Sequence, residues 1–451
     1  MVNNVKMPAA PDPALADRPI DLLRTLLRFN TTNPPGNEAA CVRWIDRLLT
    51  AAGFETTLLA RDPARPNLIT RLRGSGKAPP VLLYGHVDVV TTAGQAWCHP
   101  PFAGTVADGF VWGRGALDMK GAVTMMLGAL LRTKRAGFEP AGDIVLAVLA
   151  DEEAGGDYGA RFLVEEHAEH FAGIDSALGE FGGVTMHFAG RRLYPIQVAE
   201  KQLCWLRASI TGPAGHASRT LRGGAAARLG ALLTTLDRLR LPVHLTAVTR
   251  RRLAAMAAVA PRHLRWLLRA LGHPRLARRA LTLLGSAARA IEPWLCHTVN
   301  ATILRGGEKI NVIPAEITLE LDARLLPGFT PDDLLAELAP RLGGGVTLEV
   351  TRFDPGPPAP SWLLFDLLAD VLRQADPGAV VMPMLLPAFT DARHFARLGI
   401  QTYGFTPMKL PPDLNLFDTI HAADERIPVD ALAFGIEALE QVLRRYPGRS
   451  R

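Results

Sequence analysis

Cysteine is scarce in this chain, and the few that occur form no motif. The 451 residues include 4 cysteines, at positions 41, 98, 204 and 296, and no two of them have the CxxC spacing. We therefore expect reduced, mostly packed thiols, and neither a disulfide framework nor a cysteine-based metal site.

Long apolar segments are missing as well. No uninterrupted hydrophobic run reaches the length that is needed to cross a membrane, and residues 1–6 lack the apolar core of a signal peptide. From these absences we expect a soluble, cytoplasmic protein. We also expect the last residues, Pro447 to Arg451, to form a frayed tail.

Acidic residues and lysine are absent from residues 238–291, which contain twelve arginines. Because the whole chain has a net charge of +6, the remainder carries a net −6. Residues 262–271 place Leu and Trp at helical spacing with Arg between them, a pattern typical of basic amphipathic helices. Such helices contact an anionic membrane, accept a long acyl chain, or form a solvated, partly dimer-facing surface. Since no recognition motif accompanies the charge, we expect no nucleic-acid binding.

Charged and imidazole side chains follow the apolar runs at the points where predicted strands end. The Asp-Glu-Glu triplet at 151–153 follows the run 144–150, and His86 and Asp88 follow the run 81–85. Like charges beside a buried strand end repel each other unless a proton or a cation intervenes. Ligands of open α/β sheets bind beyond the carboxyl ends of the strands. The sequence therefore predicts a metal site in an α/β domain.

Three further candidate ligands lie in comparable segments: Asp118 in a glycine-punctuated loop, Glu180 after a short apolar run, and His421 far downstream. Each candidate has an ordinary interpretation when it is taken alone. His86 suits a structural histidine, residues 151–153 suit the start of a helix, and Asp118 suits a turn. If there were no metal site, all these ordinary interpretations would have to be correct at the same time. We therefore favour the hypothesis that the candidate side chains converge on a metal site.

Seven segments in order give the chain its resemblance to a known family, the co-catalytic zinc peptidases and deacylases of the M20 type, which include aminoacylase-1 and carboxypeptidase S. The segments surround His86, Asp118, Glu152-Glu153, Glu180, His216, Thr390-Asp391 and His421. The resemblance implies an α/β catalytic domain with a mixed central sheet flanked by helices. It also implies that an α+β lid and dimerisation domain interrupts the catalytic domain.

The resemblance implies two Zn²⁺ ions, with Co²⁺ or Mn²⁺ as substitutes. His86, Asp118 and Glu180 look like the ligands of one ion. Asp118, Glu153 and His421 look like the ligands of the other, so that Asp118 bridges the two.

Two acidic residues have implied roles beside the ligands. Asp88 would hold the imidazole of His86 in its ligating tautomer. Glu152 would be the general base that takes a proton from the attacking water and passes it to the leaving amine.

The domain boundaries follow from where the strand and helix alternation stops and resumes. We expect a catalytic domain from residues 1–202 and 327–451. The inserted domain is expected at 203–326, with the basic helical segment at 238–291 inside it.

Two residues of the expected insertion have implied roles across a homodimer. His216, in a segment similar to the family's GHSS motif, would stabilise the oxyanion in the neighbouring subunit. Asn300, on a predicted strand, would help to bind substrate; alternatively, it is a sheet residue whose amide is satisfied by hydrogen bonds. Ala217 departs from the family pattern beside His216.

Arg393 sets the expected substrate class. In aminoacylase-like members the matching arginine holds the α-carboxylate of the substrate, a task that suits a guanidinium fork. We therefore expect hydrolysis of N-acyl amino acids or of short peptides with a free carboxylate. A dipeptidase or carboxypeptidase is the alternative within the family, and a non-catalytic binding module is a remote one. Phe389 and Ala422 stand where many relatives have Gly.

Overall fold

The fold is taken from a computed structural model, which describes residues 11–356, 360 and 362–446. The residues considered for a signal peptide, and the expected frayed tail at 447–451, lie outside this range. The chain divides into two compact units. The first contains residues up to Val198, Pro360–Met384 and those from Thr390 onward, and the second contains Ala199–Ala359 and Leu385–Phe389.

The first unit is built on a nine-stranded mixed sheet, which confirms the predicted fold class. Eight strands lie in the order β1 (Thr56–Leu59), β2 (Asn67–Leu72), β6 (Ile144–Leu149), β3 (Val81–His86), β7 (Ser176–Gly179), β17 (Gln401–Gly404), β9 (Arg191–Glu200) and β16 (Val380–Leu386), and β8 (Met186–Phe188) pairs with β9. The pairs β6–β3, β3–β7 and β7–β17 are parallel. A separate three-stranded sheet contains β4 (Thr105–Ala107), β5 (Phe110–Trp112) and β18 (Arg426–Pro428).

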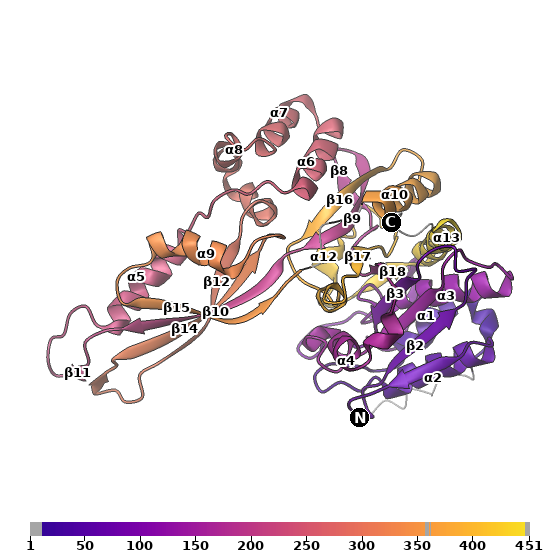
Figure 1. The fold of residues 1–451 in the computed structure, drawn as a ribbon, viewed down its shortest axis with the longest axis horizontal. Coiled ribbons are helices and arrows are strands. Elements are labelled where there is room, and N and C mark those ends of the chain that lie inside the picture. Colours follow the sequence, from indigo (N-terminus) through magenta and orange to yellow (C-terminus); the bar gives the residue numbers. More distant parts are fainter. Residues whose placement is uncertain (1–10, 357–359, 361, 447–451) are drawn as a thin grey trace. The chain divides into compact units, whose positions relative to one another are not determined.

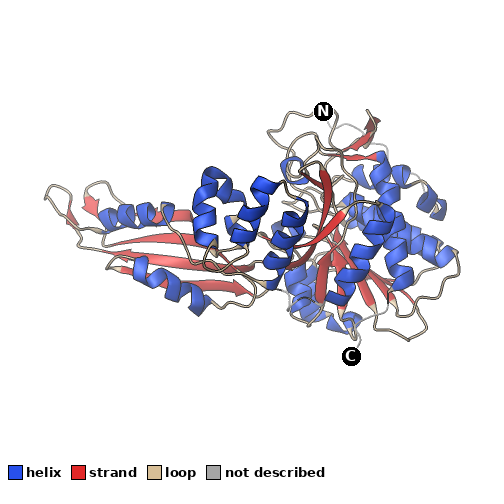
Figure 2. Cartoon of the chain, turned by 90° about the horizontal axis from the view of Figure 1, so that it is seen from above, coloured by secondary structure: helices blue, strands red, loops and turns tan. Residues whose placement is uncertain are grey.

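Helices cover both faces of the large sheet (Figure 2). The helices of the first unit are α1 (Pro19–Leu27), α2 (Ala39–Ala51), α3 (Lys120–Arg135), α4 (Ala160–Glu166), α10 (Trp362–Ala375), α11 (Ala392–Ala396), α12 (Leu416–Thr419) and α13 (Val429–Arg445). Successive residues of β3 face opposite layers. Tyr84 packs in a cluster with Phe162 of α4 and Phe395 of α11, whereas Gly85 faces Val123 of α3. Burial on both faces explains why β3 and β6 are continuously apolar.

The second unit is built on a four-stranded antiparallel sheet (Figure 1). Its strands lie in the order β12 (Thr298–Gly306), β14 (Glu316–Leu325), β10 (Gln202–Thr211) and β15 (Val346–Asp354), and β11 (Gly215–His216) pairs separately with β13 (Val312–Ile313). Its helices are α5 (Ala225–Asp237), α6 (Ala247–Val259), α7 (Arg262–Leu271), α8 (Ala277–Leu284) and α9 (Pro331–Leu338). Every second residue of β14 is buried, because only one face of the sheet packs on apolar side chains of α5 and α9.

The second unit continues past the predicted end of the insertion at residue 326. The strand β15 returns to pair with β10, and α9 packs on the same core. The prediction took the renewed alternation of helix and strand after Pro327 as a return to the catalytic domain. The same alternation also occurs within the second unit, so periodicity could not distinguish the two. The segment 238–291 contains helices α6, α7 and α8, as its pattern predicts.

Gly179 of β7 leaves room for the ring of Tyr84 on β3, and an alanine there would be costly. A Cβ at this position would lie 2.1 Å from Cζ of Tyr84, whose ring packs 4.8 Å from that of Phe395. We predict that Gly179→Ala lowers the free energy of unfolding by about 1–3 kcal/mol. Gly230→Ala in α5 is the control, since no atom lies within 4 Å of its Cβ position. This change should raise the stability by about 0.5–1 kcal/mol. Denaturant unfolding of both variants measures the difference, and equal effects would contradict the packing argument.

Candidate metal and active site

Three neighbouring strands of the first unit end at one edge of the sheet, and each brings a candidate ligand there. His86 is the last residue of β3, residues 151–153 follow β6, and Glu180 follows β7. Because β3 pairs in parallel with both other strands, the three carboxyl ends lie together.

His86, Asp118 and Glu180 form the first group of side chains. Nε2 of His86 lies 3.2 Å from Oδ1 of Asp118 and 3.5 Å from Oε2 of Glu180. The other ring nitrogen, Nδ1, lies 3.0 Å from the backbone oxygen of Asp88. A proton on Nδ1 that is donated to this oxygen leaves the lone pair of Nε2 directed at the two carboxylates. All three side chains are buried, so the group has the donor set of a metal site.

Asp118, Glu153 and His421 form the second group. Nε2 of His421 lies 3.2 Å from Oδ2 of Asp118 and 3.2 Å from Oε2 of Glu153. The imidazole of His421 is 51% exposed, which makes this group the more open of the two. Asp118 contributes one oxygen to each group. The structure therefore brings together all five residues that were predicted as ligands.

Burial controls the electrostatics of these carboxyl groups. It raises the pKa of Glu180 to about 7, although His86 opposes the shift. It also raises the pKa of Glu152 well above its usual value, and the nearby Glu180 adds to that effect. Burial acts in the same direction on Asp118, but hydrogen bonds with His421 and His86 outweigh it and hold that pKa below its usual range. The groups thus share a site in which negative charge is in excess.

Asp88 holds the segment after β6 in place. Its two carboxylate oxygens accept hydrogen bonds from the backbone N–H groups of Glu152 and Glu153, at 3.2 and 3.1 Å. One of them also accepts a hydrogen bond from Nδ2 of Asn33, at 2.9 Å. The predicted contact with the imidazole of His86 is made mainly through the backbone oxygen of Asp88, because its carboxylate oxygen lies further away, at 3.4 Å.

A buried ion pair extends this network, and no pattern in the sequence predicts it. Asp151 accepts a hydrogen bond from Asn33 at 3.0 Å and lies 2.8 Å from Nη1 of Arg65. Arg65 also donates two hydrogen bonds to Glu38. No local pattern distinguishes Arg65 or Glu38 from exposed charges, so only the tertiary structure reveals them.

Glu425 holds the loop that carries Asp118, and its role was also missed. Its carboxylate accepts hydrogen bonds from the backbone N–H groups of Gly115, Leu117 and Asp118 and pairs with Arg114 at 2.7 Å. The side chain of Glu425 is completely buried, although it lies only four residues after His421. One segment therefore supplies a candidate ligand and fixes the loop of another.

Arg393 and Asp391 lie at the start of α11. Nη2 of Arg393 donates to the backbone oxygen of Gly155 at 2.8 Å, which ties the guanidinium to the loop after Glu153. Asp391 is buried, and within the described part of the chain neither of its carboxylate oxygens has a hydrogen-bond partner. Burial raises the pKa of this carboxyl to about 8, against the effect of Arg393.

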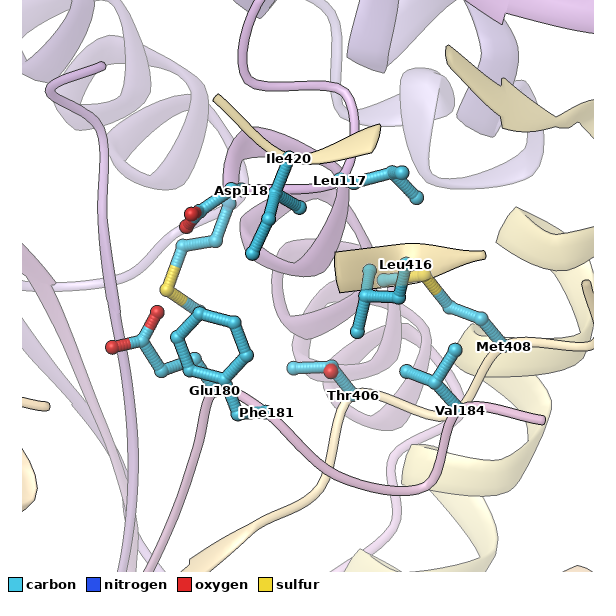
Figure 3. A pocket seen from close by; sticks show the side chains of 10 residues that line it. Leu117, Asp118, Glu180, Phe181, Val184, Thr406, Met408, Leu416 and Ile420 are labelled. Atoms are coloured by element: carbon cyan, nitrogen blue, oxygen red, sulfur yellow. The ribbon is translucent and has the colours of Figure 1, made fainter. Parts of the chain in front are cut away.

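A small cavity with largely apolar walls adjoins Asp118 and Glu180 (Figure 3). The other lining residues include Phe181, Val184, Met408, Leu416 and Ile420. Asp118 and Glu180 are themselves buried, and burial is the main cause of the raised pKa of Glu180.

His216 and Asn300 belong to the second unit. His216 is exposed on β11, where Nδ1 lies 2.8 Å from Oγ of Ser218. Asn300 is exposed on β12, opposite Asp322 of β14. Neither belongs to the two groups that contain Asp118.

Comparison with known proteins agrees with this geometry. Residues 82–445 match the model of peptidase family M20/M25/M40. Aminoacylase-1 of Sus scrofa is 26% identical over 440 residues, with 94% of each chain covered. A probable carboxypeptidase S-like 2 of Dictyostelium discoideum is 27% identical over 361 residues, with 78% of this chain and 68% of that protein covered.

A solved structure shows the same fold. The M20 family metallo-carboxypeptidase Sso-CP2 of Sulfolobus solfataricus superimposes with a TM-score of 0.68 at 18% identity, over 96% of this chain and 99% of that one. The family match spans the strand ends that bring the candidate ligands together. The chain thus belongs to peptidase family M20/M25/M40 and is a metallohydrolase that cleaves amide or peptide bonds.

Proposed function

We propose that this enzyme hydrolyses the amide bond of N-acyl amino acids with a free α-carboxylate, and that it uses two divalent cations. The observation that carries the proposal is the position of Asp118. Its Oδ1 lies 3.2 Å from His86, and its Oδ2 lies 3.2 Å from His421. One carboxylate is therefore placed to join two groups, each with one imidazole and two carboxylates.

The residues fit a pair of metal ions. Oε1 of Glu153 and Oε1 of Glu180 are buried and have no hydrogen-bond partner within the part of the chain that the structure describes. A cation would satisfy these oxygens and offset the excess negative charge. The nitrogen and oxygen donors suit Zn²⁺, and Co²⁺ or Mn²⁺ are substitutes of the same chemistry.

Glu152 is the proposed general base. When bound, paired cations polarise the scissile carbonyl and acidify a water. Glu152 lies beside Glu153 but belongs to neither ligand group, so its carboxylate remains for proton transfer. Asp88 fixes the backbone of both residues, which keeps their two roles separate. Glu152 accepts the proton of the attacking water and delivers it to the leaving amine nitrogen.

Arg393 is the proposed anchor for the substrate carboxylate. Its guanidinium is buried against Gly155, two residues after Glu153, so it lies beside the ligand loop. A guanidinium recognises a carboxylate through two parallel hydrogen bonds. The similarity to aminoacylase-1 supports N-acyl amino acids as the substrates of this enzyme. The carboxypeptidase S-like relative favours the second candidate, a peptide with a free C-terminus.

The second unit is proposed to form a homodimer and to supply His216 and Asn300 to the partner's active site. In the described part of the chain, β12 pairs only with β14, and it therefore forms an edge of the four-stranded sheet. Ile303 and Leu304 on this edge are 47% and 52% exposed. An exposed apolar edge is a template for pairing with another strand. His216 is exposed on the same unit and would donate a hydrogen bond to the oxyanion.

The adjacent glutamates provide the first test of this mechanism. We predict that Glu152→Gln lowers kcat by about 10²–10⁴-fold and leaves the metal content unchanged, because only the proton acceptor is lost. Glu153→Gln should lower the metal content as well, since it removes a ligand. Metal analysis and turnover of N-acetyl, long-chain N-acyl and dipeptide substrates, with a chelator as a further control, measure both effects. Loss of metal in Glu152→Gln would overturn the assignment.

The second test concerns the substrate carboxylate. We predict that Arg393→Lys raises KM for an N-acyl amino acid by about 10–100-fold, because it keeps the charge but removes the bidentate fork. KM for the matching N-acyl amino acid amide should change little. A purely structural role, through the contact with Gly155, would instead impair both substrates equally.

The third test asks whether His216 acts across a dimer. His216→Ala and Glu152→Gln should each be inactive alone, whereas their mixture should recover about one quarter of the wild-type activity. Half of the dimers are then mixed, and each mixed dimer has one complete site. Adding Ile303→Lys to both chains should abolish the recovery by breaking the edge contact, whereas Val106→Lys, at a similarly exposed position of β4, should not. A mixture without activity would show that His216 does not act in trans.

A further inference from the structure

The helices α6–α8 carry a surface charge of one sign that the proposed reaction does not use. Within residues 238–291, the only charged side chains are arginines. The exposed ones from α6 onward are Arg250, Arg251, Arg262, Arg269, Arg275, Arg279 and Arg289. Arg278, by contrast, is half-buried and pairs with Glu292. The segment 238–291 therefore carries positive charge and contains no acidic residue of its own.

Helix α7 places an exposed tryptophan between two of these arginines. Leu268 and Leu271 are buried, and they fix the inner face of the helix. At 3.6 residues per turn, Arg262, Trp266 and Arg269 lie together on the opposite face. Trp266 is 55% exposed. A large aromatic ring held in water on a basic face is typical of helices that lie at a membrane interface.

Helix α8 has the same arrangement. Ala277, Ala280 and Leu281 are buried, whereas Arg279 and Leu283 lie on the outer face, and Leu283 is 70% exposed. Leu276, just before the helix, is 43% exposed. The two helices follow each other directly and lie next to each other in the second unit (Figure 1).

Three exposed arginines on these two helices, and a fourth in the segment that connects them, are not held by acidic partners. Among the residues that the structure describes, Arg262, Arg269, Arg275 and Arg279 form no ion pair. On an ordinary solvated helix, exposed arginines pair with acidic side chains or alternate with them along the sequence. Unpaired arginines beside exposed Trp and Leu side chains are instead suited to a binding partner that offers both negative charge and apolar groups.

We propose that the outer face of α7 and α8 docks on the surface of a membrane that contains anionic phospholipids. The arginines pair with the phosphate and carboxylate headgroups, and Trp266 and Leu283 enter the boundary between headgroups and acyl chains. The contact is peripheral, since no helix among the described residues is long and apolar enough to cross a bilayer. This inference concerns binding only, so it does not depend on the proposed substrate.

Co-flotation of the full-length protein with vesicles tests the proposal. We expect binding to vesicles with about one third phosphatidylserine at about 0.1 M salt, weak binding to pure phosphatidylcholine, and release at high salt. Replacing Arg262, Arg269, Arg275 and Arg279 with Gln should weaken binding by at least about tenfold. Trp266→Ala should weaken it at unchanged charge.

A matched variant controls for net charge. Arg43, Arg47, Arg191 and Arg373 are exposed residues of the first unit, and replacing them with Gln removes the same charge. This variant should bind like the wild type. Equal loss in the two quadruple variants, or no binding of the wild type to anionic vesicles, would overturn the proposal. Equally tight binding to duplex DNA, with no effect of Trp266→Ala in either case, would also overturn it, because charge alone would then explain the attraction.

Discussion

The mutual repulsion of buried carboxylates at one edge of a sheet is the constraint on which the rest of the first unit depends. Asp118, Glu153 and Glu180 are brought together by strand ends and by the loops that follow them. Two imidazoles offset part of the charge, and Glu153 and Glu180 each keep an oxygen without a hydrogen-bond partner among the described residues. A fold that tolerates this arrangement must fix the surrounding backbone firmly, since relaxation would relieve the repulsion.

The fixing is done by carboxylates that face backbone N–H groups. Asp88 accepts hydrogen bonds from the N–H groups of residues 152 and 153, and Glu425 accepts them from residues 115, 117 and 118. In both cases a buried negative charge is stabilised by several donors at once. The proposed ligands Asp118 and Glu153, and the proposed base Glu152, are thereby held by residues that belong to neither candidate metal group.

Much of this candidate site could be predicted from the sequence, because several of its candidate ligands follow apolar runs that are strongly biased to form buried strands. His86, the triplet after β6 and Glu180 are of this kind, and their convergence follows from parallel pairing. Arg65, Glu38 and the buried role of Glu425 could not be predicted, since they act through contacts between residues distant in sequence. The end of the inserted unit was misjudged for a related reason. The sequence of β15 does not indicate to which sheet this strand belongs, because that depends on its pairing with the distant strand β10.

The strand order has a consequence for how the enzyme is made. β17 lies between β7 and β9, although it follows them by some two hundred residues, and the chain forms the whole second unit before it reaches β17. A nascent chain that has already emerged as far as β9 therefore has a gap in the middle of its sheet. That gap is filled only when residues 401–404 leave the ribosome, shortly before His421 completes the second candidate metal group. An unpaired strand edge thus stays exposed while some two hundred further residues are synthesised, the condition in which chaperone binding competes with aggregation.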